Sequence, residues 1–81
     1  MIDYTEANAA IKKCYEDVKA NRKPDFVAIG HAYGFIFKHD ERFADGPLSH
    51  ALNVIYGGEL HDCGATDEDM DAAAAAARTH F

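Results

Sequence analysis

The chain has 81 residues, of which 48% are hydrophobic and 27% are charged, and its formal net charge is −6. This length predicts one domain, residues 1–81, and this composition excludes an intrinsically disordered chain. No run approaches the ~18 uninterrupted apolar residues of a membrane span, and the N-terminus shows no export signal, so we expect a cytoplasmic protein in which Cys14 and Cys63 are reduced.

The first predicted element is a helix near residues 3–20. Asp3 is a candidate N-cap, and Glu6 three residues later makes an acidic variant of the capping box. Asn21 is an acceptable C-cap, and Pro24 prevents the helix from continuing. One apolar stripe is predicted from steps of three and four residues, formed by Tyr4, Ala7, Ile11, Cys14 and Val18.

Residues 25–38, which include the apolar run "FVAIGHAYGFIF", have two interpretations. Gly30 and Gly34 each cost a helix about 1 kcal/mol relative to alanine, which favours a β-hairpin around "GHAYG". Against the hairpin, neither apolar run alternates, no Asn-Gly or Asp-Gly turn is present, and the remaining chain offers no strand to extend a sheet. Asp25 is a competent N-cap, so we predict a helix.

The last predicted helix, near residues 66–79, is built on six alanines from Ala72 to Ala77. Thr66 is its expected N-cap, and three acids in the first turn suit the helix dipole. Its narrow apolar stripe is Met70, Ala73, Ala77 and Phe81. Gly30 and Gly34 lie one turn apart, and small residues at this spacing let a second backbone approach closely. We therefore expect the alanine helix to pack on the two glycines.

Between these elements we predict a third helix near residues 47–56, with Pro47 in its first turn and Gly57 as its C-terminal cap. Residues 39–46 form a polar connector whose Phe43 is expected to fold back onto the core, and residues 58–65 form a second loop. The predicted fold class is all-α: a small four-helix bundle with helices near 3–20, 25–38, 47–56 and 66–79.

The charge is concentrated in one part of the chain. Residues 25–81 hold ten acidic and three basic side chains, a balance of −7. Six acids and no base occur between residues 59 and 71, namely Glu59, Asp62, Asp67, Glu68, Asp69 and Asp71. Such a surface repels phosphate backbones, which argues against direct nucleic-acid binding and for a partner protein with a basic surface.

Histidine and cysteine were considered as metal ligands or catalytic groups. His61 and Cys63 lie close together in a predicted loop, and Cys14 or His50 are candidate additional ligands. Their spacing does not match the paired ligands of structural zinc sites, so we expect no metal and no cofactor. Ser49 and His50 are adjacent on a predicted helix, where neighbours point in different directions, and we expect no enzyme activity.

These observations favour a non-enzymatic acidic protein-binding module. Its binding residues would be the six acids between 59 and 71, with Phe35, which lies off the main apolar stripe, as an exposed apolar anchor. One form of this function is an inhibitor that occludes a basic nucleic-acid-binding surface, as small anti-defence proteins of phages and plasmids do. Two alternatives are a metal- or thiol-dependent protein that uses His61 and Cys63, and a homodimeric structural subunit.

Overall fold

A computed structural model describes residues 2–81, and this part of the chain contains helices and no strand. The four principal helices are α1 (Thr5–Lys19), α2 (Phe26–His39), α3 (Pro47–Tyr56) and α5 (Asp67–Arg78). A one-turn helix, α4 (Glu59–Asp62), and a 3₁₀ turn, η1 (Glu41–Phe43), lie in the connections. The predicted all-α bundle is confirmed, and the run from Phe26 to Phe37 is a helix rather than a hairpin.

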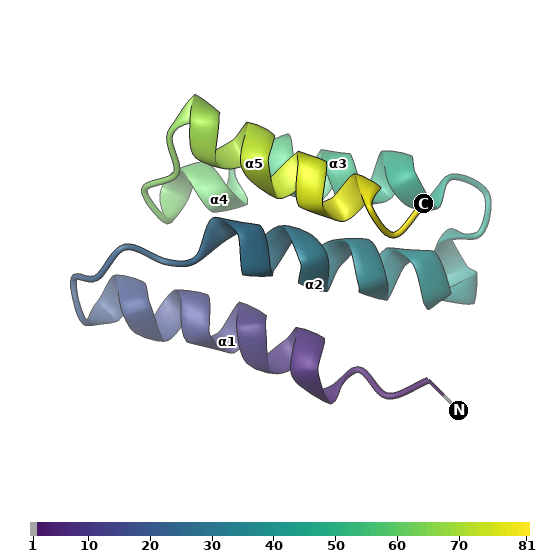
Figure 1. Cartoon of the computed structure of the whole chain (residues 1–81), viewed down its shortest axis with the longest axis horizontal. Coiled ribbons are helices and arrows are strands. Elements are labelled where there is room, and N and C mark those ends of the chain that lie inside the picture. Colours follow the sequence, from purple (N-terminus) through teal and green to yellow (C-terminus); the bar gives the residue numbers. More distant parts are fainter. Residues whose placement is uncertain (1) are drawn as a thin grey trace.

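Helix α2 is the central element of the bundle (Figure 1). Helix α1 packs along one side of α2 and runs antiparallel to it, while α3 and α5 form the layer on the other side. Helix α5 runs in the same direction as α2, and α3 runs in the opposite direction. None of the helices in residues 2–81 combines the length and the apolarity that crossing a membrane requires.

The two glycines of α2 lie directly against the backbone of α5. A Cβ added to Gly30 would lie 2.6 Å from the carbonyl carbon and 2.7 Å from the Cα of Ala73. One turn later, a Cβ added to Gly34 would lie 2.7 Å from the carbonyl oxygen of Ala77. Real Cβ atoms do not approach backbone atoms so closely, so only glycine allows these helices to sit at this separation. The predicted packing of the alanine helix on the glycines is confirmed.

The helix ends are set by local hydrogen bonds. Helix α1 begins two residues later than expected: Tyr4 is its N-cap, and Asp3 accepts from the Thr5 amide at 2.9 Å without capping the helix. At its other end Asn21 takes a left-handed conformation (φ +59°), and the Arg22 amide donates to the Asp17 carbonyl, which together form a Schellman motif. Asp25 is the N-cap of α2, and its side chain accepts from the Ala28 amide, as predicted.

The core lies where α2, α3 and α5 meet, and it differs from the predicted stripes at two positions. Val18 is 39% exposed, whereas Asp17, one residue earlier, is only 3% exposed. Phe81 is also exposed, because α5 ends at Arg78 and the last residues leave the helical register. Phe43 does fold back as predicted, with its ring 4.8 Å from that of Phe37. The main buried cluster consists of Cys14, Phe26, Ile29, Ile55, Leu60, Ala65, Met70, Ala73, Ala74 and Ala77.

Candidate functional site

The six predicted binding acids occupy α4 and the beginning of α5. We call the surface formed by Glu59, Asp62, Asp67, Glu68, Asp69 and Asp71 the acidic end. Helix α4 and the first turn of α5 lie at the same end of the molecule as the last turns of α1 (Figure 1). The fold therefore brings the six acids into one region and places part of α1 beside them.

Three of these carboxylates already have partners within the chain. Asp69 accepts from the Thr66 amide at 3.0 Å to complete a capping box, and it pairs with the Lys23 ammonium group at 3.2 Å. These interactions, led by the backbone hydrogen bond at Thr66, lower the pKa of Asp69. The carboxylates of Glu59 and Asp71 each accept a hydrogen bond from a tyrosine hydroxyl.

Two exposed tyrosines lie beside the acidic end. Nothing in the sequence indicated that they contact its carboxylates. Tyr15 of α1 donates to Glu59 and is 42% exposed; Tyr56 of α3 donates to Asp71 at 2.7 Å and is 46% exposed. The hydrogen bond to the carboxylate raises the pKa of each tyrosine, so both hydroxyls are protonated donors at neutral pH. Tyr15 and Glu59 are 44 residues apart in the sequence, and Tyr56 and Asp71 are 15 apart, so no local sequence pattern predicts either contact.

The remaining acids of this region are unneutralised. Asp62, Asp67 and Glu68 are exposed, and within residues 2–81 none of their carboxylates forms a hydrogen bond or ion pair with another side chain. The basic side chains that follow α1 do not neutralise these three carboxylates, because Arg22 pairs with Asp17 and Lys23 pairs with Asp69. The acidic end thus presents three available negative charges beside two fixed tyrosine rings.

Phe35, the predicted apolar anchor, is half-buried rather than exposed. Its ring packs edge-on against Tyr4 at 5.8 Å and lies 4.8 Å from the ring of His39. It forms part of the wall of a pocket between α1 and α2, and that pocket contains none of the six acids. The structure therefore separates Phe35 from the acidic end, and its role as a binding residue stays a prediction.

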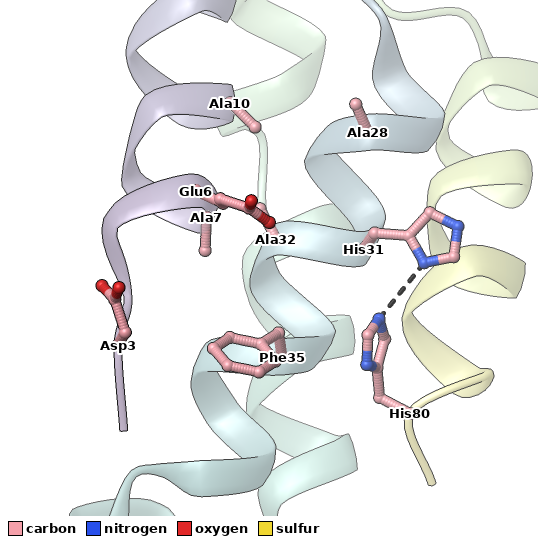
Figure 2. A pocket seen from close by; sticks show the side chains of 9 residues that line it. All are labelled: Asp3, Glu6, Ala7, Ala10, Ala28, His31, Ala32, Phe35 and His80. Carbon is pink, nitrogen blue, oxygen red and sulfur yellow. Dashed lines mark hydrogen bonds between the residues drawn. The ribbon is translucent and has the colours of Figure 1, made fainter. Parts of the chain in front are cut away.

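That pocket is the larger of the two cavities described on the molecule, with a volume of about 370 Å³. Four alanines form its floor, Phe35 forms a wall, and the carboxylates of Asp3 and Glu6 lie at its α1 side (Figure 2). The opposite side is formed by His31 of α2 and His80, which follows α5. Its lining is Asp3, Glu6, Ala7, Ala10, Ala28, His31, Ala32, Phe35 and His80.

The two histidines of the pocket form a hydrogen bond with each other. His31 Nδ1 and His80 Nε2 are 3.2 Å apart, a hydrogen bond between the two rings. Burial lowers the pKa of His80, and positive charge on His31, His39 and Lys38 lowers it further. The lowered pKa favours the neutral form of His80 at pH 7, and Asp3 and Glu6 are the acidic side chains of the pocket.

The candidate metal and thiol residues are not assembled into a site. In the part of the chain that the structure describes, no group of three or more His, Cys, Asp or Glu side chains is placed to hold a metal ion. His61 is exposed, while Cys63 packs beside the buried Cys14. Burial, and then the neighbouring Cys63, raise the pKa of Cys14 to about 12, so its thiol is protonated at neutral pH.

Comparison of the chain with protein-family models, with curated proteins and with solved structures finds no match. Two surfaces of the molecule carry chemistry from which a function can be inferred. One is the acidic end with its tyrosines, and the other is the pocket between α1 and α2.

Proposed function

We propose that the protein is a non-enzymatic binding module that docks its acidic end onto the basic surface of a partner protein. The observation that supports this most is the combination of three unpaired carboxylates with two exposed tyrosines, Tyr15 and Tyr56, held in place by hydrogen bonds. Carboxylates give long-range attraction to a basic partner and raise the association rate.

The tyrosines add the short-range part of the interaction. Tyrosine is enriched at protein interfaces, because it offers a large apolar ring together with a polar tip. The hydrogen bonds to Glu59 and Asp71 restrict the rings before binding, which lowers the entropy cost of ordering them in a complex. The region thus combines carboxylates that attract a basic partner with tyrosine rings that are already ordered for contact.

The partner surface that fits is one rich in lysine and arginine. In its sharpest form the proposal is that the carboxylates occupy the positions of nucleic-acid phosphates on a basic nucleic-acid-binding protein and so inhibit it, in the cytoplasm. A homodimer joined through the acidic end is disfavoured, since a symmetric interface would bring Asp62, Asp67 and Glu68 against their own copies.

A pair of double variants tests the proposal. Asp67→Asn with Glu68→Gln removes two available charges of the acidic end, while Glu41→Gln with Asp45→Asn removes two acids from the connection between α2 and α3, at the other end of the molecule (Figure 1). Each double variant changes the net charge from −6 to −4, so only the position of the charge differs. Asp69 is retained in both, because it caps α5.

The measurement is capture of partner proteins on the immobilised chain, followed by competition. We expect a basic protein that the wild type and the control variant retain, that the acidic-end variant loses, and that added nucleic acid or about 0.5 M salt releases. Equal loss in both variants, or capture that is independent of salt and of nucleic acid, would contradict the proposal. Circular dichroism of all three proteins verifies that the helices are intact.

A further inference from the structure

The pocket between α1 and α2 combines two acidic side chains with an otherwise largely apolar lining. Its α1 side has two carboxylates, Asp3 and Glu6, and neither has a cationic partner among residues 2–81. Its floor and walls are otherwise apolar, formed by alanines and the ring of Phe35. Figure 2 shows the Glu6 carboxylate extending from α1 toward α2, across the alanine floor.

We propose that this pocket binds the side chain of an arginine that a partner polypeptide presents. The three methylenes of arginine would lie on the alanine floor, and the guanidinium group would reach Asp3 and Glu6 and stack on Phe35. The site is distinct from the acidic end, so this inference does not depend on the function proposed for that surface.

Several properties of the pocket select a guanidinium group over other ligands. Two separated carboxylates match its planar array of donors, and its faces stack on aromatic rings, as a compact ammonium group does not. The Asp3 carboxylate is already oriented by its 2.9 Å hydrogen bond from the Thr5 amide. The volume of about 370 Å³ lies at the lower end of ligand pockets, which suits one side chain with its flanking backbone.

The same lining disfavours a free amino acid. No lysine or arginine lines the pocket, so the α-carboxylate of free arginine would find no cation and would face Asp3 and Glu6. An arginine within a polypeptide lacks that charge. The lining therefore favours a residue of a chain over a metabolite, and it excludes phosphates and other anions.

The His31–His80 pair closes the side of the pocket opposite Asp3 and Glu6, with ring nitrogens 3.2 Å apart. Burial lowers the pKa of His80, which favours its neutral form, so His80 adds no positive charge that would oppose a guanidinium group at neutral pH.

The test is an NMR titration of the ¹⁵N-labelled protein with Nα-acetyl-arginine amide. Nα-acetyl-citrulline amide is the matched probe, since it has the same length and an uncharged urea in place of the guanidinium. We expect saturable shifts of amides in residues 3–10 and 28–35 with the arginine probe. We expect at least about tenfold weaker binding of the citrulline probe, because its uncharged urea cannot form charge-assisted hydrogen bonds with Asp3 and Glu6.

Variants locate the site. Glu6→Gln should weaken binding of the arginine probe by about tenfold, the effect of one lost charge-assisted bond. Glu16→Gln, another exposed acid of α1 that lies outside the pocket, should leave it unchanged. The dispersion of each spectrum shows whether the variant is folded. Equal binding of the two probes, no saturable binding, or shifts confined to residues 59–71 would contradict arginine binding in the pocket. The last of these results would still be compatible with the function proposed for the acidic end.

Discussion

Asp17 shows how ion pairs can change which residue of a helix turn is buried. After Cys14, both residue 17 and residue 18 fit a helical step, and the sequence favoured the apolar Val18. The structure buries Asp17 instead, because Lys13 donates to it at 3.0 Å and Arg22 donates to its other oxygen at 3.0 Å. Arg22 reaches Asp17 only through the left-handed turn at Asn21, which no periodicity analysis of α1 includes.

This cluster predicts a loss of stability in acid. The hydrogen bond from Lys13, followed by that from Arg22, lowers the pKa of Asp17 below its ordinary value of 3.8. A carboxyl group whose pKa is lower in the folded state contributes stability above its unfolded pKa, and that contribution is lost as the pH falls through the folded pKa. We expect Asp17→Asn to be less stable than wild type at pH 7 and to lose less stability on acidification.

Urea denaturation between about pH 2 and pH 7 measures this effect. Asp62→Asn is the control, because Asp62 is exposed and its carboxylate has no side-chain partner in residues 2–81. Its stability profile should follow that of the wild type. Parallel profiles for Asp17→Asn and wild type would show that the ion pairs of Asp17 contribute nothing.

The residues of the two proposed binding surfaces were predictable only in part. The sequence shows the cluster of acidic residues between 59 and 71, so all six acids of the acidic end could be identified from it. Which of them are available depends on Tyr15, Tyr56 and Lys23, whose partners lie 15 or more residues away in the chain. The sequence predicts Asp3 and Glu6 as caps of α1, but the helix begins at Thr5 without a side-chain cap, and both residues line the pocket.

Helix α5 was the most predictable element, since its signals are local. Thr66 accepts from the Asp69 amide at 3.2 Å, and the Asp69 carboxylate accepts from the Thr66 amide, which is the reciprocal arrangement of a capping box. Helix α4 was missed for the opposite reason. It has four residues, too few to show a periodicity, and it forms where Gly58 takes a φ of +105° and Leu60 enters the core.

The capping box predicts a specific cost for Thr66→Ala. Loss of the side-chain acceptor leaves the Asp69 amide without its partner, and removal of such a cap lowers the free energy of unfolding by about 1 kcal/mol. Ser49→Ala is the control, because Ser49 is exposed on α3 and its hydroxyl caps no helix. Urea denaturation should show a smaller midpoint for Thr66→Ala alone. Equal midpoints for the two variants would show that the Thr66 cap does not stabilise the protein.

The contact between α2 and α5 fixes the relative position of both proposed binding surfaces. His31 and Phe35 are on α2, and His80 follows α5, so the pocket depends on how these two helices meet. Asp67 and Glu68 begin the same α5, so the acidic end depends on it too. The sequence predicted this contact, because glycines and alanines one turn apart indicate close backbone approach. It did not predict the pocket, which needs the position of α1 as well.

Glycine substitution tests that contact most directly. Alanine at position 30 gains about 1 kcal/mol of helix propensity, but its Cβ would lie 2.6 Å from the carbonyl carbon of Ala73. We expect a net loss of about 1–3 kcal/mol in the free energy of unfolding through overpacking. Gly46→Ala is the control, since its Cβ would meet only the Ser49 Cβ at 3.6 Å.

The decisive measurement is urea denaturation of Gly30→Ala beside Gly46→Ala and the wild type. A large loss for Gly30→Ala, with Gly46→Ala within about 0.5 kcal/mol of wild type, is the predicted result. A Gly30→Ala protein as stable as the wild type, or more stable, would contradict the close packing of α2 on α5 and with it the placement of both surfaces.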